Sequence, residues 1–192
     1  MTLGRDPGLP VAAAQTLRWA GRGRAAGELL LAAPLANTGH LVGWIRAAIT
    51  SARLAAPAAS AVLLVAPAMG PEADAELFRI ARLVRQYTPV RWVEVALSGG
   101  DPGVDEGVER CRLLGAEEVL LVPASFVPVP ARPGTRTAGP LLGRASLTTL
   151  IHRRATEAEH RWSAHRDDGL SMPAPHRHTH DRRQKETHTH VG

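Results

Sequence analysis

The stretch Ala61-Val62-Leu63-Leu64-Val65-Ala66-Pro67-Ala68-Met69-Gly70-Pro71-Glu72-Ala73-Asp74-Ala75-Glu76-Leu77 decides the fold. Its apolar run 61–66 is typical of a buried strand, 67–70 of a tight turn, and 71–77 of the first turns of a helix. In α/β folds the ligand site lies at this kind of boundary, beyond the carboxyl end of a strand. The turn itself carries no side chain suited to catalysis.

Downstream of this stretch, strand and helix patterns alternate. Apolar residues in 72–86 recur every three or four positions, which predicts an amphipathic helix. A strand is expected over 90–97, a helix over 104–114 and another buried strand over 119–122. This order predicts an α/β fold with a doubly wound parallel sheet flanked by helices.

The flanking regions are expected to hold further elements. Helices are predicted over 11–20, 40–53 and 142–157, and 28–33 is predicted to be a strand buried on both faces. The proline-rich stretch 124–140 has no periodicity and is predicted to be a long loop.

The composition of the chain indicates which kinds of binding partner and which cellular compartment to expect. The net charge is +5, but basic and acidic residues alternate without aromatic platforms, so a nucleic-acid partner is not expected. The apolar runs are far shorter than the roughly 20 residues that span a bilayer, so no membrane partner is expected. Cys111 is the single cysteine and reads as a buried hydrophobe. We therefore expect a cytoplasmic protein.

Two proline-led segments share the same spacing. Pro34-Leu35 is followed by Leu41, Ile45 and Thr50 at the intervals at which Pro140-Leu141 is followed by Leu147, Ile151 and Thr156. One interpretation is that any proline turn followed by an amphipathic helix has this form. The other is a duplicated module that closes each of two lobes. The sequence leaves both open.

Three segments together resemble the class II tetrapyrrole metal chelatases, the sirohydrochlorin cobalto/ferrochelatase family. They are the strand 62–66 with the helix start 71–77, the strand 93–97 with the acidic helix start 101–110, and the run Leu114-Gly115-Ala116-Glu117-Glu118-Val119-Leu120-Leu121-Val122-Pro123. The resemblance implies a chelatase-like, flavodoxin-like topology with a tetrapyrrole held at the carboxyl ends of the strands. It also implies a divalent metal (cobalt, nickel or iron) and a lyase role in cobalamin or siroheme biosynthesis.

The chain departs from the family at the positions that do the chemistry. The family's first histidine falls at Pro67, its acidic position in 98–100, and its second histidine near Ala131. The resemblance therefore implies a lobe without independent metal insertion, which binds a tetrapyrrole or metal, or completes an enzyme with a second chelatase lobe or as a homodimer. The alternatives are an active chelatase with non-standard ligands and a metal-binding accessory protein.

The chain is divided into an N-terminal segment 1–56, expected as a remnant of a preceding lobe, a chelatase-like domain 57–158 and a disordered tail 159–192. The candidate metal ligands are all in the tail: His176, His178, His180, His188 and His190. Alternate histidines of an extended chain lie on one side and can share a divalent ion. The competing interpretation is a low-complexity polar tail. His40 and His152 are expected to be surface or capping residues.

Overall fold

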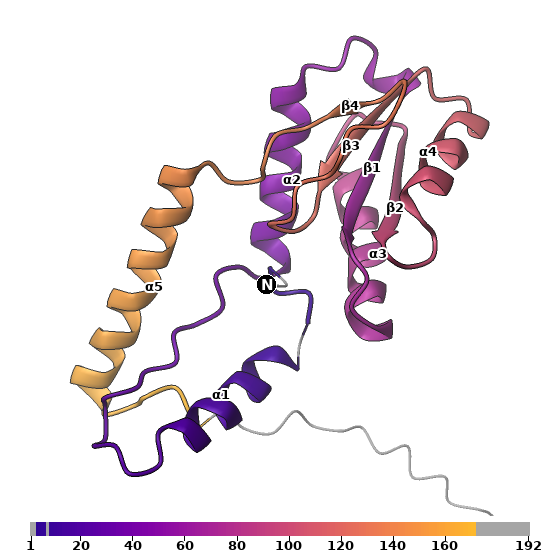
Figure 1. The fold of residues 1–192 in the computed structure, drawn as a ribbon. Helices are drawn as coiled ribbons and strands as arrows, with labels where there is room; N and C mark the ends of the chain where they lie inside the picture. Colours follow the sequence, from indigo (N-terminus) through magenta and orange to yellow (C-terminus); the bar gives the residue numbers. More distant parts are fainter. Residues whose placement is uncertain (1–2, 7, 172–192) are drawn as a thin grey trace, which may run out of the picture.

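The computed structural model describes residues 3–6 and 8–171. Its elements in chain order are α1 (Leu9–Ala20), α2 (Thr38–Ala52), the 3-10 turn η1 (Pro57–Ala59), β1 (Ser60–Pro67), α3 (Pro71–Gln86), β2 (Trp92–Ser98), α4 (Val104–Leu113), β3 (Glu118–Pro123), β4 (Arg136–Thr137) and α5 (Arg144–His165). Figure 1 shows the strands gathered with α2, α3 and α4, whereas α1 and α5 stand apart from the sheet.

The four strands form one sheet in the order β2-β1-β3-β4, and every pair is parallel. Helices α2 and α3 cover one face, where they share a buried apolar cluster with the sheet, and α4 covers the other face. The prediction of a doubly wound parallel sheet is thus confirmed. The apolar run of β1 is buried throughout because the strand is central and both of its faces are covered.

The predicted strand 28–33 is wrong. The segment belongs to no strand, and Leu29, Leu30 and Leu31 are only half-buried. Its backbone bonds other segments only through Leu31, whose amide donates to the Asp168 carbonyl oxygen (2.8 Å) and whose carbonyl accepts from Arg161 (2.7 Å). The residues have the composition of a buried strand, but a strand needs neighbours to bond, and the described chain supplies none.

Two predicted boundaries also change. Helix α5 continues to His165, so residues 159–165, which were predicted to belong to the tail, are helical, and the chain then turns back toward Leu31. Helix α2, assigned to the N-terminal segment 1–56, packs on the sheet through Leu41, Ile45 and Ile49. The division at 56/57 therefore separates the sheet from one of its covering helices. The histidines His176, His178, His180, His188 and His190 lie outside the described residues.

The longest helix, α5, has 22 residues and is largely polar. Neither it nor any other helix in residues 3–6 and 8–171 combines the length and apolarity needed to cross a membrane.

Candidate functional site at the carboxyl edge of the sheet

The turn between β1 and α3 is the place where the fold would put its chemistry. Its backbone is held by Asp74 of α3, whose carboxylate accepts from the amides of Met69 and Gly70, each at 3.2 Å. A carboxylate in the first turn of a helix is also stabilised by the helix dipole. The carboxylate of Asp74 is thus committed to closing the turn.

A buried arginine from the chain's beginning occupies the same turn. Arg5 is 1% exposed, and its guanidinium donates to the carbonyl oxygens of Pro67 (3.2 Å) and Ala73 (3.4 Å) and to the Met69 thioether (3.3 Å). The carboxylate of Asp74 lies 3.9 Å from its Nη1. Burial lowers the pKa of the Arg5 guanidinium below its ordinary value, and the Asp74 charge opposes that effect. Because an arginine side chain stays protonated in proteins, the Arg5 guanidinium places a positive charge at the carboxyl end of β1.

Arg5 reaches this position because the chain before it lies tightly against the start of α2. Gly4 has φ +81°, and a Cβ placed there would lie 2.5 Å from the Ala36 carbonyl oxygen. Only glycine fits such a close approach in that backbone conformation. Sequence reasoning missed Arg5, because nothing in the polar, proline-containing N-terminus indicates that one of its arginines is buried.

The predicted chemical positions beside β1 and β2 come together without forming a ligand set. Pro67 is paired in register with Ser98. A Cβ at Gly100 would lie 2.7 Å from the Ala68 Cβ, so the two turns are in contact and leave no room between them. Ala131 is exposed, and its neighbour Arg132 pairs with Asp105 of α4. The described residues contain no cluster of three or more histidine, cysteine or acidic side chains able to hold a metal.

The other residues singled out in the sequence have structural roles. Asp105 pairs with Arg132 and Glu106 with Arg110. Cys111 is fully buried, and desolvation raises the pKa of its thiol to about 12, with Glu94 adding to the effect. A thiol with so high a pKa is unreactive at neutral pH, so Cys111 acts as a small hydrophobe.

His40 is confirmed as a capping residue. Its amide donates to the Asn37 side chain (3.0 Å), and its Nδ1 accepts from the Asn37 amide (3.4 Å), which completes a capping box at the start of α2. Because Nδ1 is an acceptor, the neutral ring carries its proton on Nε2. In that form Nε2 is a hydrogen-bond donor and not a metal ligand.

A cavity of about 630 Å³ lies between α2 and α5, and we call it the α2–α5 cavity. It is lined by His40, Trp44, Leu142, Ala145, Ser146, Thr149, Leu150 and Arg153. The rings of His40 and Trp44 are stacked on its α2 wall, with centroids 5.9 Å apart and planes inclined by 25°. Arg153 of the α5 wall is about half exposed, and its Nε lies 3.7 Å from Glu157. An aromatic wall facing a cation and two hydroxyls suits a flat, anionic ligand.

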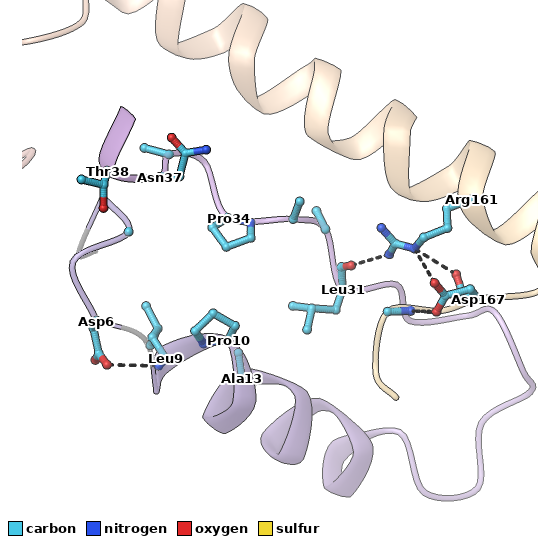
Figure 2. Close-up of a pocket in the computed structure, with 15 residues that line it drawn as sticks. Asp6, Leu9, Pro10, Ala13, Leu31, Pro34, Asn37, Thr38, Arg161 and Asp167 are labelled. Carbon is cyan, nitrogen blue, oxygen red and sulfur yellow. Dashed lines mark hydrogen bonds and ion pairs between the residues drawn. The ribbon is translucent and has the colours of Figure 1, made fainter. Parts of the chain in front are cut away.

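A second cavity of about 540 Å³, the N-terminal cavity, lies between α1 and the segment 31–38 (Figure 2). Its walls are mostly apolar, and its charged groups stand at the two ends. At one end Asp6 accepts from the Leu9 amide (3.2 Å), and at the other Arg161 pairs with Asp167 (3.2 Å) and donates to the Leu31 carbonyl oxygen (2.7 Å). These charges are satisfied within the chain, so the cavity offers few free polar groups to a ligand.

Comparison with known proteins finds one curated relative over part of the chain. A segment of 54 residues is 43% identical to the sirohydrochlorin cobaltochelatase of Priestia megaterium, covering 28% of this chain and 18% of that protein. Over this segment the chain is similar to the class II tetrapyrrole chelatases. No protein-family model matches it. The matched segment is a small part of the curated relative's length, and the activity of that whole protein does not transfer to this chain.

Solved structures show the same fold. The chain superposes on SirB from Bacillus subtilis with Fe3+ at a TM-score of 0.56 and 12% identity, covering 80% of this chain and 67% of SirB. The cobalt complex of the sirohydrochlorin chelatase SirB from Bacillus subtilis subspecies spizizenii gives 0.51 and 11%, covering 84% and 66%. The predicted flavodoxin-like parallel sheet of the chelatases is confirmed.

Proposed function

We propose that the chain is a tetrapyrrole-binding or metal-binding lobe of sirohydrochlorin chelatase type, without independent metal insertion. It would serve cobalamin or siroheme biosynthesis in the cytoplasm, with cobalt, nickel or iron as the metal that its partner inserts. The observation that carries the proposal is the state of the turn after β1. Pro67 has no metal-binding atom on its side chain, and the Arg5 guanidinium lies against its carbonyl oxygen at 3.2 Å. Two cations do not share such a site.

The α2–α5 cavity supports tetrapyrrole binding outside the blocked turn. A tetrapyrrole is a flat conjugated ring with peripheral carboxylates. The ring pair His40–Trp44 offers a face for stacking, and the exposed Arg153 offers a cation for a carboxylate. The Nε2 proton of His40 adds a donor. The cavity volume falls within the range usual for small-molecule sites.

The first experiment tests for insertion. Purified protein is mixed with sirohydrochlorin and Co2+, and the absorbance change of the macrocycle is followed. We expect the rate of the protein-free control. A rate above that background would favour the alternative of an active chelatase with non-standard ligands.

The second experiment tests for binding. Titration with metal-free sirohydrochlorin should give saturable binding, and Trp44→Ala or Arg153→Gln should raise the dissociation constant by about tenfold each. Trp19→Ala is the matched control, because Trp19 is 68% exposed on α1 and does not line the α2–α5 cavity. Absence of binding by the unmodified protein would remove the tetrapyrrole role.

A partner-lobe role is the second part of the proposal. Helix α2 covers this sheet although it precedes β1, and α5 has the same residue spacing as α2 but buries only Leu150 and Ala158. This pattern supports a duplicated module, in which α5 belongs beside another lobe, either a second chelatase-like chain or a second copy.

The remaining alternative, a metal-binding accessory protein, depends on the tail histidines. It is tested by titrating Co2+ or Ni2+ into the full chain and into a chain that ends at residue 171. Equal stoichiometry in the two would exclude the tail as the metal site.

A further inference from the structure

The segment 29–33 has the sequence of an interior strand but no sheet around it. Glu28, five apolar residues and Pro34 match the order of Glu118, four apolar residues and Pro123 in β3. In β3 that run pairs with β1 on one side and β4 on the other, and its apolar side chains are at most 2% exposed. The segment 29–33 is instead half-buried to exposed.

The open side of this segment is set by the bonds of Leu31. Its amide donates to the Asp168 carbonyl oxygen (2.8 Å), and its own carbonyl accepts from Arg161 (2.7 Å). Residues 30–34 form no helix, turn or bend. Successive residues of an extended chain direct their polar groups to opposite sides. The amides and carbonyls of Leu30 and Ala32 therefore face away from Asp168, and within the described chain they have no hydrogen-bond partner.

The space around the segment is also empty. The N-terminal cavity of about 540 Å³ and a further cavity of about 400 Å³ are both lined by residues 31–34. Figure 2 shows the segment from Leu31 to Pro34 running between α1 and α5. Within the described residues, the segment 29–33 therefore lacks the neighbouring strand with which such an apolar run usually pairs.

The sheet has a matching open edge at β2. The Leu97 amide donates to the Pro102 carbonyl oxygen (2.7 Å), on the side away from β1, whereas the Ser98 carbonyl accepts from the Ala68 amide (3.2 Å) on the β1 side. By the same alternation Val93 and Val95 direct their backbone groups outward. Neither has a partner on that side among residues 3–6 and 8–171.

We propose that a second copy of the chain pairs its segment 29–33, in parallel, with the open edge of β2. The inference rests on the partner-lobe role proposed above and names the partner. With Leu31 opposite Val95, the amide of Leu30 reaches the Val93 carbonyl, the amide of Val95 reaches the Leu30 carbonyl, and the amide of Ala32 reaches the Val95 carbonyl.

The two ends of this register are set by proline and by existing bonds. The next amide position would be Pro34, which has no N–H, and the Leu97 carbonyl that it faces already accepts from Gly100 (3.2 Å). The Leu97 amide already donates to Pro102 (2.7 Å), so the Ala32 carbonyl gains no partner from β2. At the other end the chain bends at residues 28 and 29, so the ladder begins at Leu30.

The test is the mass of the full chain by light scattering over a concentration series. We expect a dimer of twice 20.5 kDa. Ala32→Pro and Val95→Pro each delete one interfacial amide and should raise the dimer dissociation constant at least about tenfold. Proline is tolerated on an edge strand where its nitrogen faces outward, so the monomer should remain folded by circular dichroism.

Matched controls separate the backbone from the side chain. Ala33→Pro removes an amide on the opposite side of the segment, and Val95→Ala keeps the amide while shortening the side chain; both should remain dimeric. In the unmodified protein, hydrogen exchange at Leu30, Ala32 and Val95 should slow with concentration, whereas Ala33 should not change.

A monomer at every concentration, or a dimer that both proline variants leave intact, would overturn the inference. Because sirohydrochlorin binding is measured independently, a monomer that still binds the tetrapyrrole would overturn the pairing alone and leave the tetrapyrrole role standing.

Discussion

The Arg5 guanidinium donates to the Pro67 carbonyl oxygen at 3.2 Å, which joins residues 62 positions apart at the carboxyl end of β1. Arg5 thereby fixes the N-terminal segment over the turn that the fold reserves for chemistry. The same contact holds the buried, positively charged guanidinium of Arg5 in the turn between β1 and α3. The first prediction concerns what this contact contributes to stability.

Replacing Arg5 with alanine should lower the free energy of unfolding by about 3 kcal/mol, because it leaves two carbonyl oxygens and the Asp74 carboxylate without their buried partner. Urea denaturation followed by circular dichroism measures the change. Arg82→Ala is the control: Arg82 is exposed on α3 and should cost less than about 0.5 kcal/mol. Equal effects of the two substitutions would mean that Arg5 is not held as described.

Two helical glycines should respond in opposite directions to alanine. A Cβ at Gly107 of α4 would lie 2.9 Å from Leu63 Cδ1 and 3.1 Å from the Ala96 Cβ, so Gly107→Ala forces the buried Leu63 side chain or α4 itself to shift. A Cβ at Gly43 of α2 would meet nothing within 4 Å. Gly43→Ala should therefore stabilise the protein by roughly 0.5–1 kcal/mol through helix propensity.

For Gly107→Ala the overpacking cost, typically about 1–3 kcal/mol, should exceed that gain. Thermal unfolding of the two variants beside the unmodified protein gives the comparison. If Gly107→Ala raised the midpoint as Gly43→Ala does, α4 would not approach β1 and β2 as closely as the structure has it.

The sheet and its covering helices could be predicted because their signal is local. The apolar run of 61–66 and the three- and four-residue spacing of 72–86 depend on each segment alone, and both elements lie where they were predicted. The sequence alone also shows that position 67, where the family that the chain resembles has a histidine, is a proline. That β1 and β2 run parallel follows from strands joined by a crossover helix, whereas the register that places Pro67 beside Ser98 is known only from the structure.

What could not be predicted depends on distant partners. The segment 28–33 has the composition of a strand, but strand pairing needs a neighbour that composition does not reveal. Arg5 carries no local sign of burial, since its ligands are carbonyl groups 62 and 68 residues away. The α2–α5 cavity brings Trp44 and Arg153 together across 109 positions of chain. No window of sequence contains both residues.

The last prediction concerns alkaline pH and the buried thiol of Cys111. Desolvation raises the pKa of this thiol from an ordinary value of 9.0 to about 12 in the folded protein. Below pH 9 the thiol is protonated in both states and has no effect. Between about 9 and 12 the unfolded chain loses the proton while the folded chain keeps it, so stability falls as pH rises.

The slope from this one group should approach about 1.4 kcal/mol per pH unit within that window. Urea denaturation at stepped pH values measures it, and Cys111→Ala supplies the control, because its free energy of unfolding should lose this component of the alkaline slope. Native protein at pH 8 should also react with a thiol reagent only as fast as it opens. Rapid labelling, or the same alkaline slope in Cys111→Ala, would show that the thiol is not buried against β2.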